Sequence, residues 1–365
     1  MAFSSIKTYS YRNLSDQKVE IENSRIFLIG TNGQGKSNFL EAVYLLAYGN
    51  SFRTNRIKEV IRKGHSEMAL HGTFIRPEEE DLFGSLSLKI SPEEKSILLN
   101  EKRVKDRKEL ISYLPAIVFS HDDISFVNGP PERQRWFFNQ IMSLFDPLFI
   151  DTLRDYRKIL KMRNNALKNQ QSDLIPVYNQ QLAVKGLEIQ SKRRHVITEF
   201  NQVVSPIFHT IAELDEPFSI EYRPSWKKMK SIDEIVNFLS GRLEQDLLYS
   251  TTTSGPHRDR FIFRLGKTDF SRIASTGQLR LMSLILRIGQ SKYFFEKTRR
   301  RPILLLDDVL LELDGEKRKR FLTELPEYEQ IFFTFLPDER YLELSDDDTA
   351  MYWVENGCIQ RMTKT

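Results

Sequence analysis

The early part of the chain alternates between hydrophobic and polar residues in the way that half-buried β-strands do. On this pattern, strands are expected at Ser4–Tyr9, Gln17–Ile21, Met68–Ile75 and Gly84–Ile90, and a hairpin around Asn100 and Glu101. Two apolar runs without alternation, Ile26–Ile29 and Ala116–Phe119, predict buried strands. We expect the first two alternating strands and Ile26–Ile29 to begin one sheet.

A helix is predicted from about Ser37 to Tyr48, soon after the buried strand Ile26–Ile29. Its apolar residues cover nearly the whole circumference, which is typical of a helix buried between layers rather than one on a surface. Gly49 stands where a left-handed residue ends many helices.

The pattern changes after about His121, where hydrophobic residues recur with helical spacing. Helices are expected at Glu132–Phe145, Leu148–Asn169, Ile175–Phe208 and Ile232–Tyr249, with a link over Glu221–Lys230. Heptads do not persist long enough for an extended coiled coil. We interpret residues 121–250 as a mainly helical insertion.

Strand patterns return in the last third of the chain. They cover Arg260–Leu265, Ile303–Asp307, Gln330–Phe335 and Met351–Ile359, with helices at about Gln278–Lys297 and Glu316–Leu325. The sequence therefore predicts an α/β protein with a mixed sheet around the first helix and a mainly helical second lobe. In this prediction, residues 1–120 and 300–365 form lobe I, and residues 121–299 form lobe II.

Composition limits the classes of protein that fit this pattern. The 365 residues are 40% hydrophobic and 28% charged, which suits a globular protein with a core. A net charge of +4 is too small to predict nucleic-acid binding by itself. The single cysteine, Cys358, fits a reducing compartment. No signal-peptide core or apolar run of ~20 residues is present, so we expect a cytoplasmic protein.

The residues between the buried strand and the helix fit the phosphate-loop pattern G-x-x-x-x-G-K-[ST]. The expected nucleotide-binding residues are Gly30, Thr31, Asn32, Gly33, Gln34, Gly35, Lys36, Ser37 and Asn38. The glycines let backbone N–H groups turn towards one anion, and the helix N-terminus adds partial positive charge. Lys36 is expected to reach the β- and γ-phosphates of ATP, and Ser37 to place its hydroxyl on Mg²⁺. A glycine-rich turn with a chance lysine is disfavoured by the flanking strand and helix.

Two adjacent carboxylates follow the later apolar run Ile303–Leu306. This is the Walker B arrangement, in which the first carboxylate holds Mg²⁺ and the second orients or deprotonates the attacking water. Alone, a strand that ends in two aspartates is more often an ordinary turn, but the phosphate loop favours the catalytic interpretation. We assign Asp307 to the metal, and Asp308 with Lys36 to catalysis.

The segment Ser275–Gln278 stands just before a predicted helix. Ser275 can cap that helix and Gly277 lets a phosphate approach the backbone, although an isolated feature of this kind is usually an ordinary cap. In chain order, phosphate loop, long insertion, S-x-G-Q, Walker B and E-L-D form the layout of an ATP-binding-cassette ATPase. In that class the S-x-G-Q element of one subunit covers the γ-phosphate bound on another. The residues expected to act in trans are Ser275, Gly277, Gln278 and Asp314.

Basic residues supply the remaining candidates. Arg53, on the loop soon after the phosphate-loop helix, could reach phosphate charge in cis or in trans, or be a surface arginine. Basic clusters at residues 53–63, 102–108, 154–163, 192–194, 227–230 and 299–301 each resemble a solvated face but together could neutralise DNA phosphates. No base-reading motif is present, so binding should follow duplex or single-strand/duplex structure rather than sequence. His257, within Thr253–Asp259, has no partner at metal-ligand spacing, which favours a structural or interface role.

Together and in this order, these motifs resemble the bacterial RecF family of recombination-repair proteins, relatives of SMC-type ATPase heads. The stretches that carry the resemblance are Tyr11–Leu14, Ile29–Tyr48, Asn50–Thr54, Val118–Gly129, Pro131–Phe138, Tyr156, Arg163-Asn164, Thr253–Asp259, Ser275–Arg280 and Leu304–Asp314. The resemblance implies an ATP-dependent homodimer on DNA with slow ATP hydrolysis. It also implies work with RecR and RecO that helps the recombinase RecA to load at single-strand gaps.

The chain departs from the family's pattern at several positions. Ser37 replaces threonine but keeps the hydroxyl, and His121 replaces proline. Asn139 replaces an acidic residue after an arginine pair that Gln134 interrupts. Leu311 replaces a small polar residue in the loop after Walker B, which crosses the dimer interface in the cassette class.

Three other classes fit less well. A transporter subunit rarely has so long a separation between Lys36 and Ser275. An ATPase-linked nuclease needs a further acidic domain beyond Walker B, for which the segment after Asp314 is short. A small-molecule kinase with a phosphate loop would leave Ser275–Gln278 and the helical lobe without a role.

Overall fold

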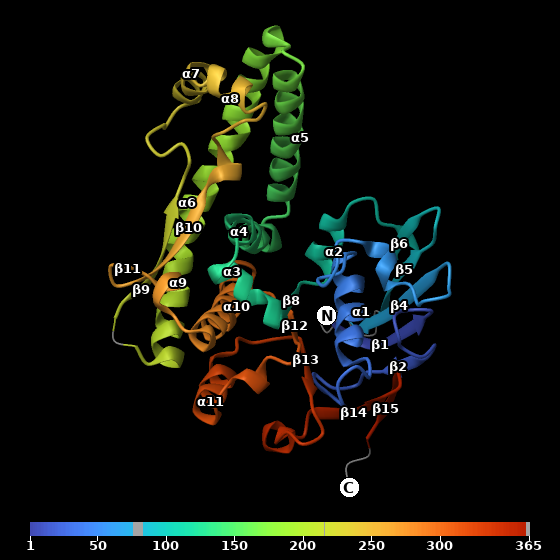
Figure 1. Ribbon diagram of the computed structural model, residues 1–365. Coiled ribbons are helices and arrows are strands. Elements are labelled where there is room, and N and C mark those ends of the chain that lie inside the picture. The colour runs from blue at the N-terminus through green and yellow to red at the C-terminus, as the bar shows by residue number, and fades with distance from the viewer. Residues whose placement is uncertain (76–82, 215, 363–365) are drawn as a thin grey trace. The chain divides into compact units, whose positions relative to one another are not determined.

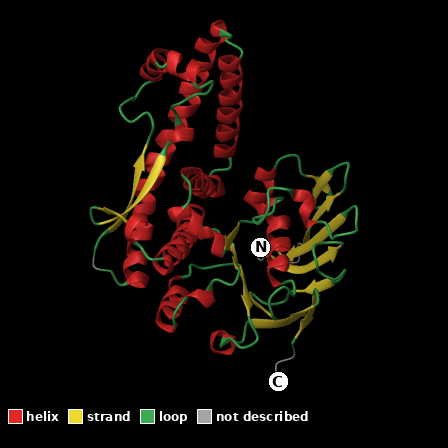
Figure 2. Cartoon of the chain, viewed as in Figure 1, coloured by secondary structure: helices red, strands yellow, loops and turns green. Residues whose placement is uncertain are grey.

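A computed structural model describes residues 1–75, 83–214 and 216–362 (Figures 1 and 2). The chain divides into two compact units. The first unit comprises Met1–His121, Phe294–Arg318 and Leu325–Thr365. The second unit comprises Asp122–Tyr293 and Lys319–Glu324.

The first unit contains an antiparallel sheet of six strands in the order β2-β1-β4-β5-β6-β7. These strands are β1 (Ala2–Tyr9), β2 (Lys18–Glu20), β4 (Met68–Ile75), β5 (Phe83–Ile90), β6 (Lys95–Leu99) and β7 (Lys102–Arg103). Asn100 and Glu101 join the last two strands with φ of 48° and 65°. Both residues are left-handed, as a two-residue hairpin turn requires, so the predicted hairpin is confirmed.

The second sheet of this unit has the order β15-β14-β3-β13-β12-β8. It consists of β3 (Arg25–Ile29), β8 (Ala116–Phe119), β12 (Ile303–Leu306), β13 (Gln330–Phe335), β14 (Thr349–Glu355) and β15 (Cys358–Arg361). All neighbours are parallel except β14 and β15. Our expectation that β3 joins the first two strands was wrong. Apart from its first residue, β3 is buried on both faces and pairs with β13 and β14, whereas β1 and β2 keep an exposed face.

Helix α1 (Lys36–Tyr48) contacts strands of both sheets, including β4 and β13, and is buried from Phe39 onwards. Figure 1 shows it beside the first sheet, in blue. Gly49 ends it at φ 68°, so both the internal position and the stop are confirmed. Helix α2 (Arg107–Tyr113) was not predicted; Asp106 and Glu109 form its capping box.

Helices make up most of the second unit, as predicted. They are α3 (Ser125–Asn128), α4 (Pro131–Phe145), α5 (Leu148–Lys168), α6 (Ile175–Ala212), α7 (Ile232–Gly241), α8 (Leu243–Leu248) and α9 (Phe270–Ile273). Helices α5 and α6 pack side by side (Figure 1). The single helix expected over Ile232–Tyr249 is interrupted at Arg242, directly after Gly241, a residue that weakens helices.

A small antiparallel sheet in the order β11-β10-β9 lies in the second unit. It consists of β9 (Phe218–Arg223), β10 (Arg260–Leu265) and β11 (Thr268–Asp269). The strand expected at Arg260–Leu265 is confirmed as β10, whereas the link expected over Glu221–Lys230 was wrong at its start, because residues 221–223 belong to β9. The aromatic faces of these strands explain their position, because Phe218 stacks on Phe208 of α6 and Phe261 stacks on Phe138 of α4.

The remaining elements complete the chain. They are α10 (Thr276–Thr298), α11 (Gly315–Glu324) and the 3₁₀ turns η1 (Ile57–Val60), η2 (His121–Ile124), η3 (Ser172–Leu174), η4 (Pro256–Arg258), η5 (Leu310–Glu312) and η6 (Tyr341–Leu344). Over the described residues, no helix combines the length and the apolar character needed to cross a membrane.

Candidate nucleotide site

The phosphate loop joins the buried end of β3 to the first turn of α1. Gly33 and Gly35 adopt φ of 79° and 121°, which L-residues with side chains rarely do. At Gly30, a Cβ atom would lie 2.3 Å from the carbonyl oxygen of Val354. The glycines therefore permit both the turn and the close approach of β14.

Two distant segments hold this loop in place. The Gln34 side-chain oxygen accepts a hydrogen bond from the Asn356 N–H at 2.5 Å, and its carbonyl accepts one from the Gly357 N–H at 3.0 Å. The Asn13 amide donates to the Gly33 carbonyl at 2.9 Å. The turn between β14 and β15 was missed at the sequence level, where the pair Asn356-Gly357 was an available signal.

Lys36 is buried and lies over the loop that it belongs to. Its Nζ donates to the carbonyl oxygens of Gly30 at 2.6 Å and Thr31 at 3.1 Å. Burial lowers the Lys36 pKa, while the charges of Asp308, Asp307 and Glu339 oppose that shift. The ammonium group is therefore positioned within the loop by weak carbonyl acceptors, which a phosphate could replace.

Ser37 and Asp307 meet although they belong to different strand–loop segments. The Ser37 Oγ donates to Asp307 Oδ1 at 2.7 Å. Partial burial, helped by the charge of Asp308, raises the Asp307 pKa to about 6. The Ser37 hydrogen bond and the charges of Arg53 and His121 oppose this rise. A hydroxyl and a carboxylate that is costly to ionise are oxygen ligands suited to Mg²⁺.

Asp308 is held in a left-handed conformation with φ of 53°. Its N–H donates to the Thr334 Oγ1 at 2.7 Å, and the Thr334 hydroxyl donates to Asp308 Oδ1 at 2.8 Å. Thr334 is buried in β13, between the strands that carry the two motifs. We missed Thr334 from the sequence, although a polar residue inside Gln330–Phe335 was a signal.

Glu339 is a second residue that sequence reasoning missed. Its Oε1 accepts a hydrogen bond from the Leu336 N–H at 2.5 Å, and its buried Oε2 has no hydrogen-bond partner in the described part of the chain. Burial raises the pKa of this carboxyl, with Asp308 adding to the rise. The electrostatic pull of Glu339 on Lys36 places this carboxylate near the phosphate loop.

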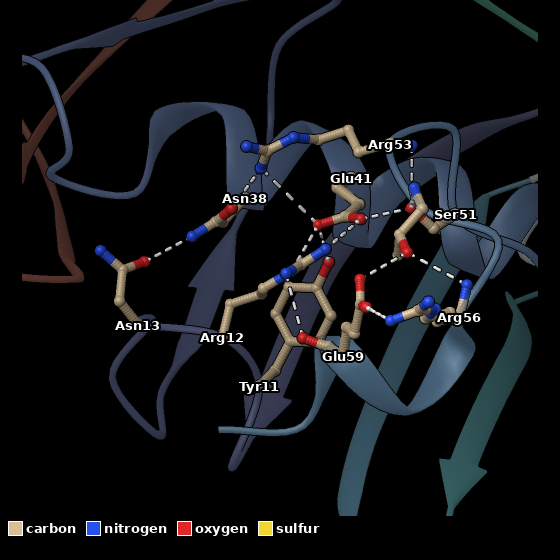
Figure 3. Close-up of polar contacts among 10 residues, drawn as sticks. Tyr11, Arg12, Asn13, Asn38, Glu41, Ser51, Arg53, Arg56 and Glu59 are labelled. Atoms are coloured by element: carbon tan, nitrogen blue, oxygen red, sulfur yellow. Dashed lines mark hydrogen bonds and ion pairs between the residues drawn. The ribbon is translucent and has the colours of Figure 1, made fainter. Parts of the chain in front are cut away.

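Arg53 connects to the phosphate loop through two amides (Figure 3). Its guanidinium donates to Asn38 at 2.5 Å, Asn38 donates to Asn13 at 2.7 Å, and Asn13 donates to Gly33. The Arg53 side chain remains 41% exposed. Arg53 is therefore near the candidate site, where its charge also lowers the Asp307 pKa.

Glu41 anchors this group of polar residues from inside α1, where it is fully buried. Arg12 binds both of its carboxylate oxygens at 2.9 Å, and the Tyr11 hydroxyl donates to it at 3.0 Å. Ser51 also donates to Glu41, and Arg53 lies 3.8 Å from it (Figure 3). The Tyr11–Leu14 stretch and the Arg53 loop are thus fastened to one carboxylate.

The residues expected to act in trans have local partners. Ser275 and Gln278 form a reciprocal capping box at the start of α10, with N···O distances of 2.8 and 3.3 Å. All four residues of Ser275–Gln278 are exposed, and a Cβ atom on Gly277 would have the Ser275 Oγ, 4.0 Å away, as its nearest neighbour. Asp314 accepts from the Lys317 N–H at 2.9 Å at the start of α11.

The first unit thus has a phosphate-loop strand, β3, and a carboxylate strand, β12, separated by β13 in a parallel sheet. A buried helix begins at Lys36, and Asp307 lies on Ser37. This arrangement, with a helical unit inserted between the two motifs, defines an ATPase head of the ATP-binding-cassette and SMC class.

Comparisons with known proteins give the family. The family model of the RecF/RecN/SMC N-terminal domain matches residues 2–360. The DNA replication and repair protein RecF of Treponema pallidum is 38% identical, over 95% of this chain and 98% of that protein. RecF of Chlamydia caviae is 30% identical, over 92% and 91%. The chain therefore belongs to the RecF family.

Solved structures agree with this assignment. The recombination mediator protein RecF with ATP, from the RecFOR pathway, superposes with a TM-score of 0.89 at 27% identity and covers 99% of this chain and 97% of that one. An SMC head bound to the C-terminal winged-helix domain of ScpA has a TM-score of 0.58 at 14% identity, which shows a shared fold. The predicted family and fold class are confirmed.

Proposed function

We propose that this chain is an ATP-dependent DNA-binding protein of recombinational repair. The observation that carries the proposal is the contact of Ser37 with Asp307, because it joins a phosphate loop to a second acidic motif in one oxygen-rich site. The RecF relative solved with ATP supports the choice of nucleotide. The expected site residues of the loop, Gly30–Asn38, then bind ATP through backbone N–H groups and Lys36.

The same site would use Mg²⁺, which neutralises phosphate charge when it is bound. Ser37 and Asp307 are its proposed ligands. Asp308, fixed by Thr334, orients or deprotonates the attacking water, and Lys36 stabilises charge on the γ-phosphate. Arg53 adds charge from the neighbouring loop, in cis or in trans. We propose slow hydrolysis that resets the protein.

The second half of the site comes from another copy of the chain in this proposal. Ser275 caps the long helix α10, whose first residues include Gly277 and Gln278, and all three residues are exposed. A γ-phosphate can therefore approach this helix N-terminus. Asp314 is proposed to contact the same nucleotide from the partner. ATP would then bring two copies head to head, because only the dimer offers these contacts.

DNA is the proposed ligand of the dimer, in duplex form or at a single-strand/duplex junction. Two basic residues that we had grouped with exposed clusters are buried: Arg163 pairs with Asp246 and Arg193 with Asp259, both at 2.7 Å. The remaining exposed lysines and arginines can still neutralise phosphates. Because the chain belongs to the RecF family, we propose that it works with RecR and RecO to load RecA at single-strand gaps. We also propose that residues 1–120 and 300–365 form the ATPase lobe and that residues 121–299 form the second lobe.

Binding to gapped, duplex and single-stranded oligonucleotides at fixed ionic strength, with and without Mg²⁺ and ATP, tests the proposal. We expect ATP to tighten binding to duplex and gapped DNA. Lys36→Arg should remove this effect, whereas Lys63→Arg, the same change on an exposed loop, should keep it. DNA binding with the same affinity in the presence and absence of ATP would contradict the proposed ATP-dependent switch.

A further inference from the structure

The second unit contains a cavity of about 190 Å³ between α4, α5, α6 and the η4 turn. Its polar lining includes Arg135, Asn139, Arg157, Arg193 and His257, and Trp136 also lines it. Arg135 and Trp136 belong to the family stretch Pro131–Phe138 and His257 to Thr253–Asp259, and neither stretch is used by the nucleotide site. The cavity therefore brings together family motifs that have no role in the nucleotide site.

Positive charge exceeds negative charge around this cavity. Three arginines line it, against the carboxylate of Glu132 and the buried Asp259 behind Arg193. The Asp259 carboxylate already accepts four hydrogen bonds of 2.5 to 2.7 Å, from Arg193, Gln190, the Tyr222 hydroxyl and the Ser225 N–H. An acidic residue in place of Asn139 would have offset one more charge. Asn139 instead accepts a hydrogen bond from Arg193 at 2.9 Å through an amide oxygen, which carries no net charge.

The arginines have capacity left for an anion. Arg193 is 3% exposed, yet its Nε has no hydrogen-bond partner within the described ranges. Among the residues that the structure describes, the one hydrogen bond of Arg135 goes to the Asp259 carbonyl at 3.0 Å. Burial and then the charge of Arg193 lower the Arg135 pKa. Arg157 is exposed and has no ion pair among the described residues. Guanidinium groups with free donors are well suited to phosphate oxygens.

Aromatic and apolar groups form the rest of the lining. The indole of Trp136 is 40% exposed and packs on Phe126, with ring centroids 5.5 Å apart and an angle of 29° between planes. His257 accepts from the Tyr156 hydroxyl at 2.7 Å and donates to the Thr252 carbonyl at 3.0 Å, an assignment that follows from these partners. Burial lowers the His257 pKa to about 4, so the ring remains neutral. The exposed indole of Trp136, together with the neutral His257 ring and the arginines of the same lining, favours stacking of a base.

We propose that this cavity receives one unstacked base of single-stranded DNA, stacked against Trp136, with the adjoining phosphate held by Arg157 and Arg135. The volume is below the ~300 Å³ at which pockets for drug-sized ligands begin, so a single ring fits and a whole nucleotide does not. The Asn139 amide offers N–H donors to a base carbonyl. An acidic peptide would match the arginines but would leave the exposed indole and this amide unused. The inference rests on the proposed DNA-binding function and adds a preference for an unpaired strand.

Fluorescence anisotropy of the full chain with single-stranded oligothymidylate, and with a duplex of equal length, tests the cavity. Arg157→Glu should weaken single-strand binding about tenfold and duplex binding much less, because a duplex keeps its bases stacked. Lys158→Glu makes the same charge change on the next residue of α5, which does not line the cavity, and should have a much smaller effect. Trp136→Ala should match Arg157→Glu, with thermal unfolding confirming that the variant is folded.

Each outcome decides the proposal. Equal losses for Arg157→Glu and Lys158→Glu would indicate general surface attraction and overturn it. Normal single-strand binding by both cavity variants, with ATP-dependent duplex binding retained, would overturn the cavity but leave the DNA-binding function. Binding of an acidic peptide at the cavity without competition from oligothymidylate would also overturn it. Absence of DNA binding by the unmodified chain would overturn both.

Discussion

The hydroxyl of Ser37 lies 2.7 Å from the carboxylate of Asp307, although the two residues are 270 positions apart in the chain. Ser37 ends the phosphate loop after β3, and Asp307 directly follows β12, which lies two strands away from β3 in the same sheet. The parallel order of β3, β13 and β12 brings the carboxyl ends of these strands to one edge. That edge collects the oxygen atoms on which the proposed Mg²⁺ and ATP chemistry depends.

Asp307→Asn should stabilise the protein at pH 8. The native-state pKa of about 6 lies above the ordinary value of 3.8, so the ionised Asp307 costs stability above pH 6. As pH falls from 6 towards 4, the folded protein binds a proton that the unfolded chain does not, and the cost disappears. We expect a gain of about 2 kcal/mol at pH 8 that shrinks towards pH 5, measured by urea denaturation.

Asp122→Asn serves as the control for this pH profile, because it makes the same change at an exposed position of the η2 turn. A stability difference for Asp307→Asn that stays constant from pH 5 to pH 8 would show that the carboxyl titrates in its usual range.

Ser275→Arg should leave a folded monomer that binds ATP but does not dimerise. The substitution removes one half of the capping box of α10, at a cost of about 1 kcal/mol, and places a bulky cation where the proposed partner phosphate enters. Sedimentation velocity with Mg²⁺ and ATP measures the dimer. Asp308→Asn should instead accumulate it, because hydrolysis slows.

Ser172→Arg makes the same substitution at an exposed position of the second unit and should dimerise normally. If Ser275→Arg formed the ATP-dependent dimer as well as this control, the contact in trans would be excluded.

Glu41→Ala should destabilise the first unit by about 3 kcal/mol. The buried carboxylate binds Arg12 through two hydrogen bonds and also the Tyr11 hydroxyl, and its removal leaves these groups without their partner. Chemical denaturation measures the loss. Glu59→Ala removes an exposed carboxylate nearby and should change stability by less than about 1 kcal/mol. Equal effects of the two variants would mean that Glu41 does not anchor the Tyr11 and Arg53 segments.

Much of the first unit could be predicted because its signals are local. The glycine spacing, the apolar circumference of α1 and the stop at Gly49 each depend on neighbouring residues. The pairing of strands was harder to predict, because an alternating or apolar run indicates how much of a strand is buried but not which strand it pairs with. For this reason β3 was assigned to the wrong neighbours, although its extent was nearly right.

The candidate site shows the same division. Gly30–Ser37 and Asp307-Asp308 were found from their motifs, whereas Thr334 and Glu339 carry no motif and enter the site only because β13 lies between β3 and β12. Charge clusters were the weakest guide. Arg163 and Arg193 look like surface residues in sequence, but each is buried against a carboxylate from far along the chain.

The sequence by itself determined the phosphate loop, its helix, the paired aspartates and the family, because backbone conformation and motif chemistry are set by residues within a few positions of one another. Only the tertiary structure decided that Ser37 meets Asp307, that Thr334 holds Asp308, and that Arg135, Trp136 and Arg157 line one cavity. The physical reason is that strand order and helix packing are selected by the burial of whole faces, a property of distant segments taken together.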